Sequence, residues 1–285
     1  MRIGFVIQNQ GNGALEQVRE LAPIVESLGF HSVWLTDHVV GVRAFAQWGY
    51  GPYWLECLTG LAYMAAQTKT IRIGTSILVA PVRDPVYAAK VLSTLDNLSN
   101  GRLNVGIGTG WSKAEFHALG RGALHEKRGA VTDETLELIL RCWQGGSFDW
   151  TSDHFNFRQM EFAPTPVQTP HPPLLIGGPA IPAVAKRIAR FGDAWHPAMT
   201  DWRELEQQMK LLNELAGRPV PVVNRLIIVP SASSEEIHNL LAAFKAIGCV
   251  ETVVDFRPAD RVSAHHAAER AMRAYGRISQ PSRHR

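Results

Sequence analysis

The sequence predicts an α/β fold, a (β/α)8 barrel, from three observations. Short runs rich in β-branched residues alternate with longer amphipathic stretches, a pattern that favours parallel strands joined by helices. Eight such strand–helix units can be placed in order along the chain. Because a barrel of this kind takes about 250 residues, a chain of 285 residues leaves little room for a second domain. An open doubly wound sheet is the structural alternative.

The first half of the chain should supply four strands and five helices. We expect the strands at residues 3–7, 32–36, 71–79 and 102–107, and the helices at 15–28, 55–68, 85–98, after Ser112 and at about 129–143. Gly29 is a suitable C-terminal residue for the first helix because glycine adopts left-handed conformations readily. Asp84 is the expected N-cap of the third helix, with Pro85 in its first turn.

The second half repeats the alternation after one interruption. Strands are expected at 174–176, 194–196, 220–229 and 251–255, and helices at 183–191, 202–216, 235–247 and 264–275. The segment 145–173 is an insertion between strands four and five, and residues 154–157 and 160–162 alternate like a small β-ribbon. A segment this long acts as a lid or an interface, or packs as an ordered excursion on the barrel rim. We therefore expect one domain over 1–275 and a basic, solvated tail over 276–285.

Composition excludes several protein classes. Hydrophobic residues make up 46% of the chain and the net charge is only +3, which excludes global disorder. No apolar run approaches the roughly 18 residues of a membrane span, and we read no signal peptide, so a cytoplasmic protein is expected. The basic residues are scattered, which argues against a nucleic-acid partner. Cys57, Cys142 and Cys249 lie far apart without a CxxC motif, and we expect buried thiols.

Chemistry in such a barrel belongs at the carboxyl ends of the strands. Asp37 and His38 follow the second strand. Three glycines (106, 108 and 110) end the fourth strand before a helix that Ser112 should cap, with Glu115 completing a capping box. Gly177 and Gly178 end the fifth strand in the same way. Either glycine turn alone is also typical of a tight βα connection, but two on neighbouring strands predict a cradle for one phosphate.

Residue types that are missing from the strand ends narrow the chemistry. No lysine lies there, which disfavours a Schiff base. Asp37 and Asp255 are too few carboxylates for a magnesium site, and without an HExxH motif we expect no catalytic metal. A bound cofactor should therefore carry the chemistry. Aromatic side chains near this face either wall a flat ring or belong to the core, and they are Trp34, Tyr50, Tyr53, Trp54, Trp111, Trp195 and Trp202.

Several motifs in the same order resemble those of the bacterial luciferase-like oxidoreductases, the luciferase-like monooxygenase superfamily. They are SVWLTDH at 32–38, IGTSIL at 73–78, DNLSNGR at 96–102, GIGTGW at 106–111, PVQ at 166–168, LIGG at 175–178 and GDAW at 192–195. Within that superfamily the chain is most similar to the branch that uses coenzyme F420, with FMN as the alternative cofactor.

The resemblance implies a set of roles. Asp37 and His38 would be catalytic residues beside the cofactor ring, with His38 as hydrogen-bond partner or proton relay. Ser76 and Ile77 match a family position that often holds a non-proline cis peptide, which presses on the rear of the ring. The cofactor would further contact Gly106, Gly108, Gly110, Trp111, Gly177 and Gly178. Trp111 stands where some F420-dependent sugar-phosphate dehydrogenases have an acidic glutamate, so that activity is disfavoured. A homodimer is implied, and a separate cofactor reductase is a further partner to consider.

The leading hypothesis is therefore hydride transfer between F420 and a small organic substrate. An FMN-dependent monooxygenase is the first alternative, and an isomerase or lyase of a phosphorylated substrate, or a non-catalytic barrel, are the others. The ordinary pKa of a histidine side chain, near 6.5, would suit His38 to proton transfer at neutral pH. His196 is a second candidate for this role, although a lone histidine at such a position more often has a structural role. Substrate choice should reside in residues 39–54 and in the insertion.

Overall fold

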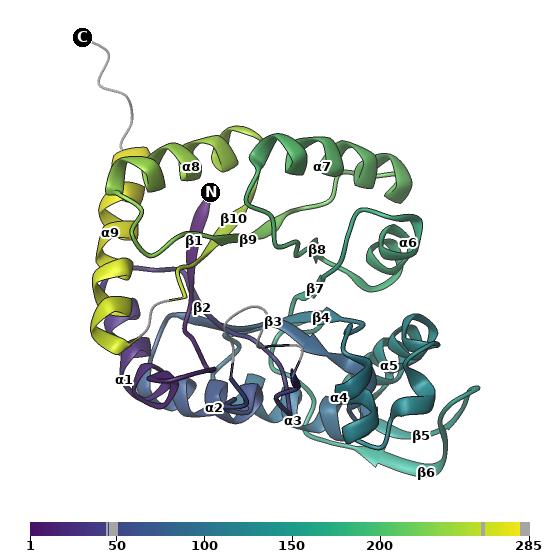
Figure 1. Cartoon of the computed structure of the whole chain (residues 1–285). Helices are drawn as coiled ribbons and strands as arrows, with labels where there is room; N and C mark the ends of the chain where they lie inside the picture. Colours follow the sequence, from purple (N-terminus) through teal and green to yellow (C-terminus); the bar gives the residue numbers. More distant parts are fainter. Residues whose placement is uncertain (44, 46–50, 258–259, 280–285) are drawn as a thin grey trace.

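A computed structural model describes the chain except for residues 44, 46–50, 258–259 and 280–285 (Figure 1). Within the described part, eight parallel strands form one sheet in the order β8-β7-β4-β3-β2-β1-β10-β9. Isolated parallel bridges join Trp195 to Val222 and Ala198 to Arg225, so the edge strands β8 and β9 meet and the sheet closes nearly into a barrel. The predicted (β/α)8 fold is confirmed.

The strands lie close to their predicted positions. They are β1 (Arg2–Val6), β2 (Ser32–Leu35), β3 (Arg72–Val79), β4 (Leu103–Gly108), β7 (Leu174–Ile176), β8 (Ala194–Trp195), β9 (Val223–Ile227) and β10 (Glu251–Asp255). The largest difference is β9, which is shorter than the predicted 220–229 at both ends.

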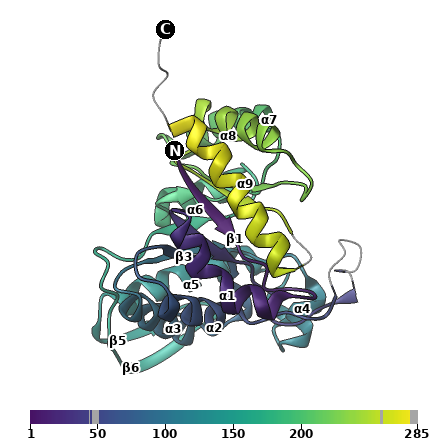
Figure 2. The same cartoon turned by 90° about the vertical axis from the view of Figure 1, so that its left-hand side faces the viewer.

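Helices surround the sheet on its outer side. They are α1 (Ala14–Ser27), α2 (Cys57–Gln67), α3 (Pro85–Leu98), α4 (Lys113–Ala118), α5 (Arg128–Trp143), α6 (Pro182–Phe191), α7 (Trp202–Ala216), α8 (Ser234–Ala246) and α9 (Arg261–Ser279). Figure 2 shows α9 lying across α1, so the two ends of the chain pack together. The last helix extends beyond the predicted 264–275 at both ends.

The predicted helix signals act as expected. The Asp84 carboxylate accepts a hydrogen bond from the Tyr87 amide at the start of α3, with Pro85 in the first turn. Gly29 follows α1 in the left-handed region, at a φ of +89°. Among the described residues no helix is long and apolar enough to cross a membrane.

The insertion between β4 and β7 contains a two-stranded antiparallel ribbon, β5 (Gly146–Thr151) and β6 (Asn156–Phe162). Of the two segments predicted to form the ribbon, 160–162 lies on β6 and 154–157 lies on it only from residue 156, and their partner β5 was not predicted. The ribbon is anchored to α5, because His154 Nδ1 and the Ser152 hydroxyl both donate to the Glu134 carboxylate. It therefore packs as an ordered excursion on the outside of the barrel (Figure 1).

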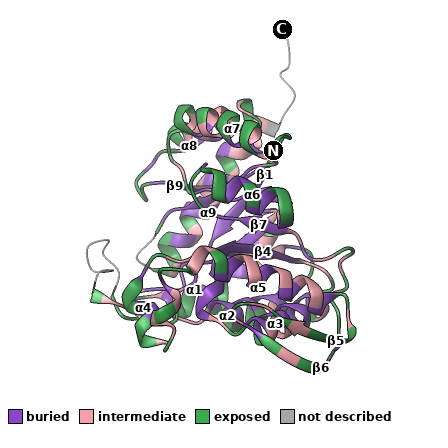
Figure 3. Ribbon diagram, turned by 90° about the vertical axis from the view of Figure 1, so that its right-hand side faces the viewer, coloured by how far each residue is buried: buried purple, intermediate pink, exposed green. Residues whose placement is uncertain are grey.

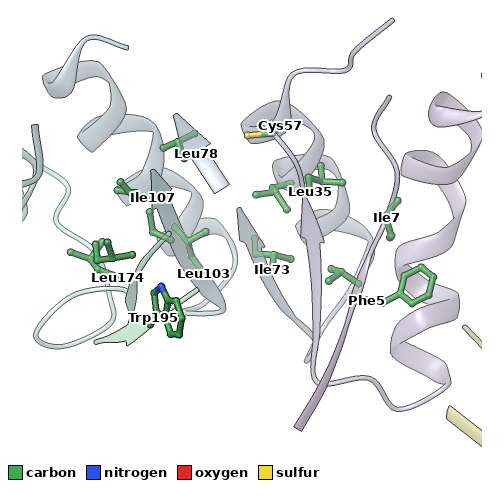
Figure 4. Packing of buried hydrophobic residues seen from close by; sticks show 14 of the residues in the cluster. Phe5, Ile7, Leu35, Cys57, Ile73, Leu78, Leu103, Ile107, Leu174 and Trp195 are labelled. Carbon is green, nitrogen blue, oxygen red and sulfur yellow. The ribbon is translucent and has the colours of Figure 1, made fainter. Parts of the chain in front are cut away.

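The main hydrophobic core lies between the sheet and the helices. Buried residues concentrate on the strands and on the inner helix faces, whereas the outer faces are exposed (Figure 3). Figure 4 shows this packing, with Phe5, Ile73 and Ile107 projecting from three different strands. A smaller apolar layer, which includes Trp34 and Val253, forms a separate cluster. All three cysteines are buried free thiols, as predicted.

Candidate cofactor and active site

A cavity of about 440 Å³ opens at the carboxyl ends of the barrel strands. Nearly all the predicted site residues line it, namely Asp37, His38, Ser76, Ile77, Gly108, Gly110, Trp111, Gly177 and Gly178. Residues not predicted as site residues complete the wall, and they are Gln10, Thr36, Phe45, Trp54, Val79, Thr109, Arg225 and Arg257. The strand-end rule therefore located the cavity from the sequence.

A second cavity of about 370 Å³ adjoins the first. The two share Ser76, Ile77, Gly178 and Arg225, and the second continues toward His196 and the loop after β8. The hollow is therefore elongated, which suits a ligand with a ring and a chain attached to it.

The shared boundary between the cavities is an irregular part of β3. The register of β3 against β4 shifts between Thr75 and Leu78, and the Ser76–Ile77 peptide bond is cis, as the resemblance predicts. Side chains from across the barrel hold this segment. His196 Nε2 lies 2.9 Å from the Ser76 hydroxyl, and Arg225 Nη1 donates to the Ser76 carbonyl at 2.9 Å.

The glycines around this segment make room for Ile77. A Cβ atom at Gly108 would lie 2.1 Å from Ile77 Cδ1, and one at Gly177 would lie 2.4 Å from the same atom. Gly106 does not line the cavity. A Cβ there would lie 2.1 Å from the Thr75 carbonyl oxygen, so this glycine allows β3 and β4 to pack closely, and its contact with a cofactor stays a prediction.

His38 is oriented by Glu115, a partner that sequence reasoning placed elsewhere. The ring Nδ1 lies 2.8 Å from Glu115 Oε2, and the other carboxylate oxygen accepts from the Val39 amide at 2.7 Å. Because a carboxylate only accepts, it fixes the proton on Nδ1 and leaves the lone pair on Nε2 of the neutral ring. Ser112 does cap α4, but the Glu115 carboxylate binds His38 and Val39 rather than closing the predicted capping box.

Asp37 is engaged on both carboxylate oxygens. Arg83 donates to them at 2.6 and 2.7 Å, and the Val79 amide donates at 2.8 Å. The Asp37 side chain is 1% exposed. Burial lowers the pKa of the Arg83 guanidinium. The charge and hydrogen bonds of the Asp37 carboxylate have the larger combined effect and raise that pKa above its ordinary value. This bidentate ion pair joins the ends of β2 and β3 and engages both carboxylate oxygens. The catalytic role of Asp37 stays a prediction.

Aromatic rings enclose His38. The ring centroids of Phe45 and Trp54 lie 4.4 and 4.7 Å from that of His38, and Trp111 lies at 6.0 Å. Other predicted aromatics lie elsewhere. Trp34 and Trp195 are fully buried, although Trp195 also borders the second cavity, and Tyr53 is exposed. Tyr50 lies outside the described residues, as do residues 44 and 46–49 of the predicted substrate loop 39–54.

His196 is a structural residue in this geometry. Its ring stacks on Trp34 and its Nδ1 donates to the Val223 carbonyl at 2.5 Å. Burial lowers its pKa to about 4, against the opposing effect of that hydrogen bond. The neutral ring therefore accepts a hydrogen bond from the Ser76 hydroxyl at Nε2 and helps to hold the irregular β3 segment.

A chain of polar side chains crosses the barrel mouth. The Thr36 hydroxyl donates to Gln10, Gln10 donates to Gln8 at 2.6 Å, and Gln8 donates to Asp255 at 2.7 Å. Asp255 is fully buried and accepts two hydrogen bonds from Arg225, at 2.5 and 3.0 Å. The amide-rich first loop is thus part of a network that fixes Arg225 at the cavity wall.

The sequence analysis did not identify the residues that hold the predicted site residues in place. Arg83 lies four residues and Glu115 seven residues beyond a strand end, Arg225 lies inside β9, and each also fits a surface role. Each could have been found as the oppositely charged partner of a residue at another strand end, but that search requires knowing which strands are neighbours.

Comparison with known proteins gives a consistent family. A model of the luciferase-like monooxygenase family matches residues 1–284. The FMNH(2)-dependent dimethylsulfone monooxygenase of Pseudomonas putida is 26% identical over 255 residues, which are 88% of this chain and 68% of the relative. The F420-dependent glucose-6-phosphate dehydrogenase of Amycolatopsis mediterranei is 29% identical over 197 residues, 68% of this chain and 56% of that relative.

Solved structures share the fold over nearly the whole chain. The monooxygenase RslO1 of Streptomyces bottropensis superposes with a TM-score of 0.80 at 21% identity, covering 97% of this chain and 98% of that one. An F420-dependent secondary alcohol dehydrogenase, solved with an F420–acetone adduct, gives a TM-score of 0.79 at 16% identity, with 96% and 98% covered. Proteins of both cofactor classes therefore resemble this chain.

Proposed function

Because the chain belongs to the luciferase-like monooxygenase family, whose model matches residues 1–284, we propose that it transfers a hydride between coenzyme F420 and a small organic substrate. The observation that carries the proposal is the pair of His38 and Glu115 at the cavity wall, 2.8 Å apart and enclosed by aromatic rings. A hydride transfer to or from an alcohol or carbonyl group needs a proton partner, and this pair supplies one.

The residues present fit a flavin or deazaflavin. The cavity is within the range of small-molecule sites, about 300–1,000 Å³, and it continues into a second hollow that would take a phosphate-bearing chain. Ile77 forms an apolar floor, while Gly110 and Gly178 present backbone without a Cβ at positive φ values. We assign Gly108, Gly110, Gly177, Gly178 and Trp111 to cofactor contact.

When bound, the cofactor supplies the two-electron chemistry. His38 would exchange a proton at Nε2, accepting it when the ring is neutral and delivering it once the ring is protonated there, because Glu115 keeps the other ring nitrogen protonated. The aromatic rings around His38 exclude water from that exchange. Asp37 positions His38 by fixing the end of β2 to Arg83, so we assign it a positioning role. From the resemblance we also propose a homodimer and a separate reductase that regenerates the cofactor.

An FMN-dependent monooxygenase is the second candidate. It is favoured by the Pseudomonas putida relative, which matches 88% of this chain. In that case His38 would serve the same proton exchange with FMN in place of F420.

A turnover assay tests the two candidates side by side. Reduced F420 is mixed anaerobically with the protein and a panel of small aldehydes, ketones and imines, and the return of the oxidised deazaflavin absorbance is followed. Reduced FMN is tested in parallel with the same panel while oxygen uptake is recorded. We expect protein-dependent oxidation of reduced F420 without oxygen.

The test variant is His38→Asn, which keeps a polar side chain but removes the ring nitrogen from which the reduced substrate would receive its proton. Its turnover should fall by roughly 10²-fold or more, the usual contribution of a general acid or base. Turnover with reduced FMN and oxygen alone would reject the F420 proposal in favour of the monooxygenase.

A further inference from the structure

We propose that Arg257, together with Arg225, forms an oxyanion site on the β9–β10 side of the cavity, which binds a phosphate or carboxylate group of the ligand. Both side chains line the main cavity. The inference deepens the proposed function, on which it rests only for the identity of the molecule that carries the oxyanion.

The charges on this side of the cavity do not balance. Arg225 and Arg257 share a single buried carboxylate, that of Asp255. Arg225 holds it closely, with Nη2 at 2.5 Å, whereas Arg257 Nε lies 3.6 Å away. Gln8 binds the remaining Asp255 oxygen at 2.7 Å. One negative charge therefore faces two guanidinium groups.

No other acid offsets this charge. Among the described residues, Asp37 is the acidic side chain that lines the cavity, and it is paired with Arg83. The sequence between 44 and 50 and at 258–259, parts of which lie outside the described residues, contains no aspartate or glutamate. A cavity wall with one excess positive charge attracts anionic ligands and concentrates them at its mouth.

The backbone at Arg257 is built for this position. Its φ of +48° lies in the left-handed region, which is uncommon for residues other than glycine, asparagine and aspartate. Non-glycine residues in this region concentrate at ligand and active sites. The Arg257 side chain is 37% exposed and Arg225 is 13% exposed, so Arg257 is the more accessible of the two to an incoming group.

The position in the barrel suits an elongated ligand with one charged end. In the strand order, β10 lies four strands from β4, so Arg257 and Trp111 stand on opposite sides of the mouth. Trp111 is 47% exposed and belongs to the aromatic wall around His38. A planar guanidinium pairs with two oxygens of a phosphate or carboxylate at once. The ligand would thus place an apolar body near Trp111 and an oxyanion at Arg257.

Binding of inorganic phosphate tests the site directly. Line broadening in ³¹P NMR is measured for the wild type, Arg257→Gln and Arg257→Lys, with ionic strength held constant by chloride. Gln keeps the backbone cost of the left-handed position, so only the charge changes. We expect Arg257→Gln to weaken phosphate binding roughly tenfold or more, and Arg257→Lys to be intermediate because it keeps the charge without the fork.

Arg261→Gln is the matched control, because Arg261 pairs with Glu20 and does not line the cavity. It should bind phosphate like the wild type, and unfolding midpoints should show that all variants fold. Equal phosphate affinity of Arg257→Gln and the wild type, or no binding by the wild type, would overturn the proposal.

Repeating the titration with the cofactor identifies the source of the oxyanion. If saturating F420 or FMN abolishes phosphate binding, and Arg257→Gln weakens binding of that cofactor but not of its phosphate-free core, the oxyanion is the cofactor's. If phosphate still binds to the cofactor complex and depends on Arg257, the oxyanion is the substrate's. If neither cofactor binds but Arg257-dependent phosphate binding persists, the oxyanion site stands and the proposed function falls.

Discussion

Replacing Arg83 by methionine should destabilise the protein strongly without touching the cavity's aromatic wall. The variant leaves the Asp37 carboxylate buried, with the Val79 amide at 2.8 Å and the weak thiol donor of Cys57 beside it. Both donors lost from Arg83 are short, at 2.6 and 2.7 Å, and the carboxylate is 1% exposed, so water cannot replace them easily. Breaking a buried ion pair on one side costs about 3–5 kcal/mol. Since domains are stable by only about 5–15 kcal/mol, this is a large part of the total.

The measurement is urea unfolding followed by tryptophan fluorescence, for the wild type, Arg83→Met, Asp37→Asn and the double variant. The double variant removes both charges, so it should be markedly more stable than Arg83→Met despite carrying one change more. That recovery is the sign of a coupled pair.

The exposed pair of Arg158 and Asp149 provides the control, because both side chains are more than half exposed. Arg158→Met should shift the unfolding midpoint too little to resolve. If Arg83→Met lies within about 1 kcal/mol of the wild type, or if the double variant shows no recovery, Asp37 is not held by Arg83 and its positioning role is wrong.

Three further perturbations test other contacts. Burial lowers the pKa of His196 to about 4 from 6.5, so the unfolded chain binds more protons between these values, and the free energy of unfolding should fall by up to about 3 kcal/mol from pH 6.5 to 4; His196→Gln should flatten that part of the profile. Partial burial raises the pKa of Glu26, but hydrogen bonds from backbone amides just before β3 outweigh it and lower that pKa to about 2. The ionised carboxylate therefore stabilises the fold fully above pH 4.5, and this stabilisation is lost as the pH falls toward 2. Glu26→Gln should cost about 1 kcal/mol of unfolding free energy at pH 7, because the site is partly exposed. Gly108→Ala should cost about 1–3 kcal/mol by crowding Ile77 Cδ1, and less in an Ile77→Val background, which lacks that atom.

Each of these has its own contradicting result. His31, whose pKa is also lowered to about 4 by burial and by Arg2 and Arg72, contributes in the same pH range, so the His196→Gln profile should be flatter but not flat. An unchanged profile would contradict the buried neutral His196. An acid-unfolding curve of Glu26→Gln identical to that of the wild type would contradict its anchoring role. Equal cost of Gly108→Ala in both backgrounds would show that Ile77 is not the neighbour that matters.

Strand order and strand ends were the parts of the fold that the sequence predicted well. Alternating periodicity, a start signal such as Asp84 and a stop signal such as Gly29 define the elements locally, so their positions follow without tertiary information. The ribbon was predicted less well. In residues 146–151 only Phe148 and Trp150 alternate with polar residues, which is a short signal because β5 pairs with a single strand at the surface and is mostly exposed.

The sequence predicted where the site lies, but not the contacts that hold its side chains in position. His38, Ser76 and Ile77 could be named because they follow strands or match motifs. Glu115 was read as a helix cap, and only the packing of α4 against the end of β2 turns its carboxylate to His38. Gly106 and Gly108 look alike in sequence, but they lie at different depths of β4, and only Gly108 reaches the cavity. Depth along a strand depends on register, which a sequence pattern does not specify.

Parallel titrations with F420 and FMN, followed by quenching of tryptophan fluorescence, test the central claim that this cavity is the cofactor site. Thr109→Phe fills part of the cavity, while Thr94→Phe adds the same ring to an exposed face of α3. We predict micromolar binding of F420 by the wild type and by Thr94→Phe, weaker binding of FMN, and a loss of roughly tenfold or more, about 1.4 kcal/mol, in Thr109→Phe. Binding of neither cofactor, or equal binding by Thr109→Phe and the wild type, would contradict the account.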